Sequence, residues 1–141
     1  MNDIMMNEQK LIDYYIRNIK AINGELDELI KTDDVKKYLE VIQDEKVKEY
    51  KYLQQKKDFV YATYASNKKQ CLKLVESINA DMDKLAKFDS LQKYFKIMKS
   101  EEVREYKKLQ DEKDFMFHSL KIHRDYLEHL KAEEEEKTKS L

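Results

Sequence analysis

Apolar side chains recur along this chain at alternating intervals of three and four residues. One series runs through the N-terminal part, at Ile12, Tyr15, Ile19, Ile22, Leu26 and Leu29. A second series continues the same spacing, at Cys71, Val75, Ile78, Met82 and Leu85. This spacing predicts helices that each bury one apolar stripe against another helix. We therefore expect these residues to form a helix seam, either within one chain or between copies of it.

The two series belong to a longer internal repeat. With a shift of 56 residues and no gap, 14 of 29 positions are identical between Lys31–Phe59 and Lys87–Phe115. A shift of 56 is a whole number of heptads, so the apolar stripe keeps its phase. The sequence predicts a tandem duplication with four segments: a lead-in at 1–14 that starts the first helix, repeats at 15–70 and 71–126, and a helix end with a frayed acidic tail at 127–141.

The composition favours long, solvated helices. The chain has no Pro and a single Gly, Gly24, and 40% of its residues are charged. Sheets need more turn residues and more β-branched runs. The predicted fold is all-α: an elongated helical bundle or antiparallel coiled coil with a tandem 56-residue repeat.

Capping residues set the expected helix boundaries. Asp34 aligns with Ser90 and Asp44 aligns with Ser100, and both residue types cap helix N-termini. The sequence leaves open whether helices break at Asp44 and Ser100; without those breaks, two longer helices result. With them, the expected helices are 8–31, 34–43, 45–87, 90–99 and 101–136.

The charge distribution and the cysteine content restrict the classes of partner and the cellular compartment that we expect. The net charge is −1, from 28 basic and 29 acidic residues that are mixed along the chain. Such mixing gives no basic patch for duplex nucleic acid or an anionic membrane. One cysteine, no apolar run of membrane length and no signal-peptide pattern predict a cytoplasmic protein without a membrane anchor.

Candidate chemistry is sparse. His118, His123 and His129 are spaced by five and six residues, so neighbouring imidazoles diverge around a helix. Cys71 lies in the stripe and is interpreted as a small core residue, with an intermolecular disulfide as a weaker alternative. The sequence shows no phosphate loop or nucleophile elbow. We expect no catalytic residue, metal, cofactor or small-molecule substrate.

Tyrosines at the stripe edges are the candidate partner-binding residues. Two aligned pairs, Tyr38/Tyr94 and Tyr50/Tyr106, would offer the same contact twice. The favoured function is a non-enzymatic protein–protein interaction module that also self-associates: a scaffold or adaptor, or more specifically a small phage or mobile-element inhibitor of a host protein. The alternatives are a protein that contacts single-stranded nucleic acid through Lys/Tyr faces and, less favoured, a metal or cofactor enzyme built on a helical bundle.

Overall fold

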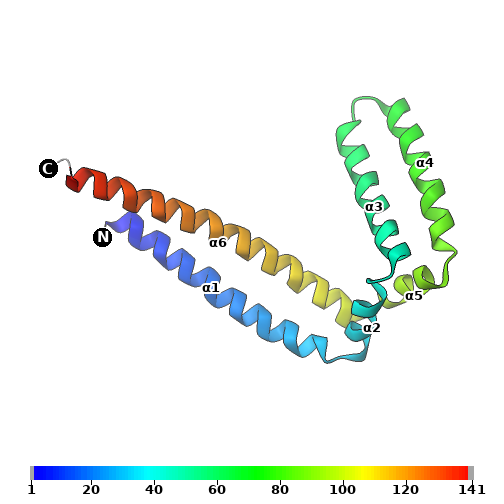
Figure 1. Cartoon of the computed structure of the whole chain (residues 1–141), viewed down its shortest axis with the longest axis horizontal. Helices are drawn as coiled ribbons and strands as arrows, with labels where there is room; N and C mark the ends of the chain where they lie inside the picture. Colours follow the sequence, from blue (N-terminus) through cyan, green and yellow to red (C-terminus); the bar gives the residue numbers. More distant parts are fainter. Residues whose placement is uncertain (1, 140–141) are drawn as a thin grey trace. The chain divides into compact units, whose positions relative to one another are not determined.

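The chain is α-helical throughout the part that the structure describes. The computed structural model describes residues 2–139, which form six helices and no strand (Figure 1). The helices are α1 Asp3–Ile30, α2 Asp33–Val41, α3 Glu45–Thr63, α4 Lys68–Ala86, α5 Asp89–Ile97 and α6 Glu101–Lys139. The all-α prediction is confirmed.

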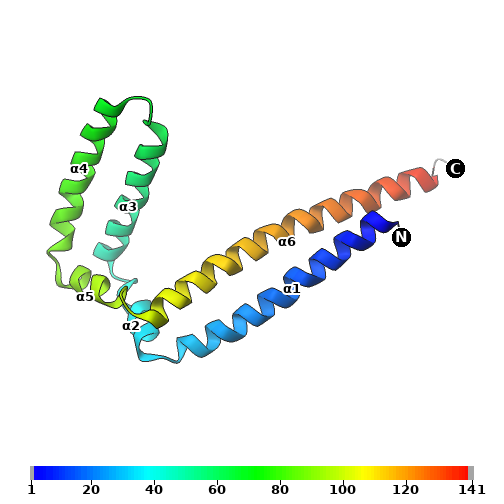
Figure 2. The ribbon, with the colours of Figure 1, turned by 180° about the vertical axis from the view of Figure 1, so that it is seen from behind.

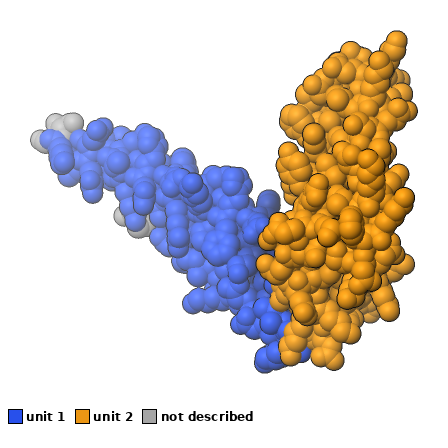
Figure 3. All heavy atoms as spheres, turned by 45° about the vertical axis from the view of Figure 1, so that its right-hand side comes forward, with its two compact units in different colours: residues 1–31, 105–141 blue, residues 32–104 orange. Residues whose placement is uncertain are grey.

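The helices group into two compact units, described here one at a time (Figure 3). Of the described residues, 2–31 and 105–139 form unit 1, and 32–104 form unit 2. The border between the units falls inside α6 and cuts across the two sequence repeats. Each unit therefore contains helices from both repeats.

Unit 1 is a pair of helices that share one apolar seam. α1 and α6 lie side by side and run in opposite directions in both ribbon views (Figures 1 and 2). Their core consists of Met5, Ile12, Ile19, Leu120 and Leu127, with Tyr15, Ile16, Met116 and Leu130 packed against it. The apolar stripe of α1 is covered in this way by a helix from the other end of the sequence.

Unit 2 contains a helical hairpin and two short helices. α3 and α4 enclose a core of Leu53, Val60, Cys71, Val75, Ile78, Met82 and Leu85. α2 packs on α5, and α5 also contacts α3 and α4. The largest fully buried side chains, Val35, Leu91, Val47 and Val103, all belong to unit 2. They form two pairs, Val35 with Leu91 and Val47 with Val103, at aligned positions of the repeat.

The predicted continuous helix over 45–87 is wrong. The structure breaks it after Thr63, and α4 starts at Lys68 with Asn67 as its N-cap. The Asn67 side chain accepts a hydrogen bond from the backbone N–H of Gln70 at 3.2 Å. Lys68 takes the place that Ile12 holds in the first repeat, so the apolar stripe is interrupted where the chain turns. A polar run with a capping residue is enough to end a helix without Gly or Pro.

The short helices α2 and α5 begin near the predicted positions, but neither Asp34 nor Ser90 is the N-cap. Thr32 precedes α2 and accepts a hydrogen bond from the Val35 N–H, whereas Phe88 precedes α5 without a side-chain cap. The breaks at Asp44 and Ser100 both exist. The Asp44 carboxylate accepts from the Val47 N–H at 3.2 Å, and the Ser100 hydroxyl accepts from the Val103 N–H at 3.4 Å.

The acidic C-terminal segment is helical as far as Lys139, although the sequence predicts that the helix ends near 136 within a frayed acidic tail. Ala, Glu and Lys are strong helix formers, and Lys137 and Lys139 place positive charge in the last turn, where it favours the helix dipole. Residues 140–141 of the predicted tail lie outside the described residues.

A charged residue introduced into the unit 2 core should lower the free energy of unfolding far more than the same residue introduced on the surface. Val75 is buried and Leu72, on the same helix, is 60% exposed. We expect Val75→Asp to lower the free energy of unfolding by roughly 3–4 kcal/mol, because the carboxylate has no buried partner. Leu72→Asp should cost only about 0.5–1 kcal/mol. Urea denaturation followed by circular dichroism measures both, and equal losses would contradict the assignment of the seam.

Gly24 should be replaceable by Ala with a gain in stability. It lies inside α1, and a Cβ built on it meets no atom within 4 Å. Gly loses more backbone entropy on folding than Ala, so Gly24→Ala should stabilise by about 0.5–1 kcal/mol. The aligned residue, Ala80 in α4, provides the reverse control: Ala80→Gly should destabilise by a similar amount. Thermal unfolding measures both, and a loss for Gly24→Ala would show that the position is constrained.

Candidate functional site

The four tyrosines predicted to bind a partner lie in the unit cores or at their edges. Tyr38, Tyr94 and Tyr106 are buried, with 3%, 5% and 6% of their surface exposed. Tyr50 is half-buried, and its ring meets the Phe95 ring edge-on at 5.2 Å between centroids. Burial raises the pKa of the Tyr94 hydroxyl, and the neighbouring Tyr50 raises it further. These rings pack within the chain, so the exposed docking surface expected of them is not present.

Other aromatic residues are exposed at aligned positions of the two repeats. Phe59 on α3 and Phe115 on α6 are 65% and 64% exposed. Two residues further on, Tyr61 and Phe117 are 49% and 47% exposed. Each unit therefore exposes an aromatic ring at both of these aligned positions, although residues two apart point to nearly opposite sides of a helix. We call Phe59 with Tyr61 the α3 aromatic pair, and Phe115 with Phe117 the α6 aromatic pair.

The helices that pair with α3 and α6 also carry apolar side chains that are not fully buried. Leu72 on α4 is 60% exposed, and its aligned counterpart on α1, Ile16, is half-buried. The Lys113 ammonium lies 5.9 Å from the centre of the Phe117 ring, close enough for a cation–π contact. Exposed aromatic rings are among the residue types that protein interfaces favour.

The exposed positions of these aromatic residues could have been predicted from the sequence. Phe59 and Phe115 are identical in the repeat alignment, yet neither continues the stripe through Tyr50, Leu53 and Val60. An aromatic residue that recurs off the buried stripe faces solvent by geometry alone. Tyr38 and Tyr94, in contrast, lie at the edge of the stripe and are buried.

A groove in unit 2 runs between α2 and α5, with a cavity volume of ≈ 820 Å³. Its lining contains four lysines and four carboxylates, with two serines among them: Lys37, Lys93, Lys96, Lys99, Asp34, Glu40, Asp44, Asp89, Ser90 and Ser100. Opposite charges are therefore balanced around the groove. This lining gives no net positive field for a phosphate backbone.

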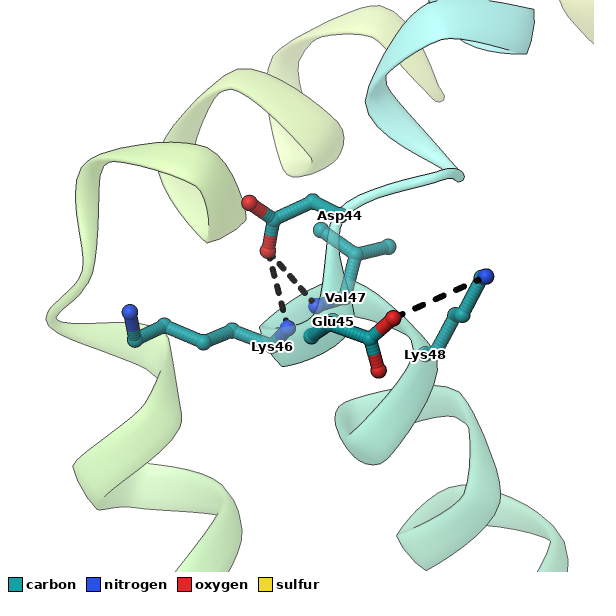
Figure 4. A network of polar contacts seen from close by, with 5 residues as sticks. All are labelled: Asp44, Glu45, Lys46, Val47 and Lys48. Atoms are coloured by element: carbon teal, nitrogen blue, oxygen red, sulfur yellow. Dashed lines mark hydrogen bonds and ion pairs between the residues drawn. The ribbon is translucent and has the colours of Figure 1, made fainter.

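Asp44 anchors one end of this groove by capping α3 (Figure 4). Its carboxylate accepts from the N–H groups of Lys46 at 2.9 Å and Val47 at 3.2 Å. Partial desolvation alone would raise its pKa, but hydrogen bonds from the Val47 N–H, the Ser90 hydroxyl and the Lys46 N–H outweigh it, and the Lys46 charge adds to them. The pKa of Asp44 is therefore below its usual value.

Two of the three histidines and the cysteine have local contacts, whereas His118 is exposed. His123 Nδ1 lies 2.5 Å from Glu8 Oε2, and the His123 ring stacks on Tyr15. His129 pairs with Glu133 one turn away, and Cys71 is buried in the unit 2 core. Among residues 2–139, no group of three or more His, Cys, Asp or Glu side chains is placed to hold a metal ion.

The predicted seam residues lie in the cores of the two units. The buried members in α1 are Ile12, Ile19, Ile22 and Leu26, and those in α4 are Cys71, Val75, Ile78, Met82 and Leu85. Tyr15 and Leu29 are half-buried. These side chains are used for contacts within the chain.

Comparison with known proteins gives no relative from which a function could be transferred: family models, curated proteins and solved structures were all searched, and none matched this chain. Over the described residues, no helix is both long enough and apolar enough to span a bilayer. The candidate site is therefore argued from the geometry of this chain alone.

The lowered pKa of Asp44 predicts a pH-dependent contribution to stability. A carboxylate whose pKa is lower in the folded state stabilises above its unfolded value, near 3.8, and that stabilisation is lost as the pH falls through the folded pKa. Asn caps helices about as well as Asp but carries no charge. Asp44→Asn should therefore be less stable than the natural protein at pH 7, and the difference should disappear in acid.

Denaturant midpoints from pH 7 to pH 2 measure this difference. Asp44→Ala is the control, because it removes the acceptor as well as the charge and should remain less stable at every pH. A difference between Asp44→Asn and the natural protein that stays constant with pH would show that the charge of Asp44 has no role.

Proposed function

We propose that this chain is a cytoplasmic, non-enzymatic protein–protein interaction module. In this proposal it consists of two tandem copies of a 56-residue helical unit, whose apolar stripes pair as antiparallel coiled coils. Helix positions support the duplication: α2 and α5 begin at Asp33 and Asp89, and α3 and α6 begin at Glu45 and Glu101, one repeat length apart in each case. The two core clusters support the pairing of the stripes. The single Cys71, which is unbonded and buried, suits a reducing compartment.

The observation that carries the proposal is the matched exposure of Tyr61 and Phe117. Both are aromatic, both occupy the same position in their repeats, and they are 49% and 47% exposed. Large rings at a protein surface supply most of the binding energy when a partner covers them. Two linked copies of one contact raise the overall affinity by about 10²- to 10⁴-fold over a single copy. The partner that suits this arrangement is a protein with two equivalent apolar pockets.

Charge balance favours a protein partner over single-stranded nucleic acid. Lys and Tyr residues are interleaved along α3, but acids are interleaved with them, as Glu45, Glu49 and Asp58 show. The groove between α2 and α5 is balanced in the same way. A nucleic-acid site depends on net positive charge, and its affinity falls log-linearly with salt.

Loss of either ring should weaken partner binding sharply. We expect tagged protein from the native host to retain one protein that is recovered much less by Tyr61→Ala and by Phe117→Ala. With the purified partner, each substitution should raise Kd by at least about 100-fold, because the gain from two linked contacts is lost. Asp58→Ala is the matched control, since Asp58 is exposed on α3 but carries no ring. Unchanged recovery with both ring variants would overturn the proposal, and salt-sensitive binding of single-stranded DNA or RNA would favour the alternative.

A further inference from the structure

α6 carries a second stripe, exposed beside the one that it buries in unit 1. The second stripe alternates steps of four and three residues through Lys108, Glu112, Phe115, Ser119, Ile122, Tyr126, His129 and Glu133. Its three apolar members, Phe115, Ile122 and Tyr126, are 64%, 52% and 44% exposed. A heptad stripe with an apolar centre and polar ends is the pattern of a helix that packs on another helix.

α1 extends this surface on the same side of unit 1. The Tyr15 ring of α1 stacks on the His123 ring of α6 at 5.6 Å between centroids. His123 is one turn from Ser119 and Tyr126 of the second stripe, so the stack lies at the stripe's edge. Leu11 is one turn from Tyr15, and the Tyr14 ring touches the Tyr15 ring edge-on. Leu11 and Tyr14 are both exposed, and we call them, together with the second stripe, the unit 1 face.

We propose that a second copy of this chain covers the unit 1 face, with the α6 helices of the two copies packed antiparallel. The reason is that the residues of the second stripe complement one another when two copies of the stripe are aligned in opposite directions. With a two-fold axis between Leu120 and Lys121, Phe115 faces Tyr126 of the second copy, and Ser119 faces Ile122. A ring therefore meets a ring, and the small serine leaves room for the isoleucine. A two-fold dimer requires this kind of self-complementary surface.

The polar side chains at the ends of the stripe are complementary in the same alignment. Lys108 faces Glu133 of the second copy, and Glu112 faces His129. Within α6, His129 and Glu133 lie 3.0 Å apart, one turn from each other, so both are held on this side of the helix. Opposite charges at the rim of an interface fix its register and direction. A parallel alignment would bring each of these groups against its own copy, so the charges favour the antiparallel one.

The face is large enough for a stable dimer. From Lys108 to Glu133 the stripe spans about 38 Å at 1.5 Å per residue, and two adjacent helices are together about 20 Å wide. The product, about 800 Å² per copy, matches the standard size of a specific interface. Unit 2 offers no equivalent surface, because α3 ends at Thr63, which aligns with Ser119 in the middle of the stripe. The inference rests on the proposed interaction function, since it assigns one docking surface to a second copy.

Light scattering coupled to size-exclusion chromatography tests the dimer. The natural protein should elute with twice the chain mass of 17.1 kDa. Ile122→Lys places two ammonium groups close to the two-fold axis, and it should raise the dimer Kd by at least about 100-fold and give the single-chain mass. Ala132→Lys is the matched control, because Ala132 is exposed on α6 but off the stripe, and it should remain dimeric. Circular dichroism checks that both variants are helical.

Disulfide cross-linking tests the direction. In the proposed dimer, residue 119 lies about 5 Å along the axis from its copy, whereas residue 108 lies about 38 Å from its copy. Ser119→Cys should therefore oxidise to a covalent dimer and Lys108→Cys should not, with the natural chain and its buried Cys71 as the background. A monomeric natural protein, a dimeric Ile122→Lys or cross-linking through residue 108 would each overturn this inference. None of these outcomes bears on Tyr61 or Phe117, so the proposed function is judged separately by partner recovery.

Discussion

Each helix pair in this protein buries a single apolar seam. The exposure of the other side chains follows from this constraint. Two helices packed side by side bury one side of each and leave the remainder exposed. In unit 1 the seam contains Met5, Ile12, Ile19, Leu120 and Leu127, and in unit 2 the seam is enclosed by α3 and α4. Within its described residues unit 1 contains no further helix, and in unit 2 the short helix α5 contacts both members of the pair but leaves much of their surface open. Aromatic residues placed off the seam, such as Phe59 and Phe115, therefore stay exposed to solvent.

The seams themselves contain polar residues, and each is accommodated in its own way. Lys57 and Lys113 are aligned in the repeat and half-buried in their units. A lysine can cover apolar surface with its methylene stem while the ammonium reaches water, as Lys113 does beside the Phe117 ring. His123 interrupts the seam of unit 1, where it meets Glu8 and stacks on Tyr15. These interruptions reduce the apolar area that each seam buries, so a second covered surface has a larger effect on stability than it would in a protein with a thick core.

Most of the helical architecture could be predicted from the sequence, because the spacing of apolar residues is a direct consequence of helix geometry. Ile12, Ile19, Val75 and Met82 are all buried as the stripe predicts. The hairpin at 64–67 was missed because helix ends here depend on single capping residues, and Asn67 resembles many helical asparagines until its partner is known. The burial of the candidate partner-binding tyrosines could not be predicted for a different reason. Tyr38 and Tyr94 lie on a stripe edge where the sequence does not show how much the neighbouring short helix covers, and α2 packed on α5 leaves them only 3% and 5% exposed.

The two copies of the proposed duplication differ in structure where their sequences differ at the seam. Ile12 continues the apolar stripe, and α1 extends back to Asp3; Lys68 interrupts it, and α4 begins there. Because α4 is short, α3 needs no more than 19 residues to cover it, whereas the 28 residues of α1 need a longer partner. α6 meets that need by continuing past Ser119, the counterpart of the last residue of α3. The added turns supply Leu120 and Leu127 to the core of unit 1 and, on their other side, bring Ile122 and Tyr126 to the surface. The extension that completes the core of unit 1 thus also creates the exposed stripe, because a helix built to cover one neighbour has a second side along its whole length.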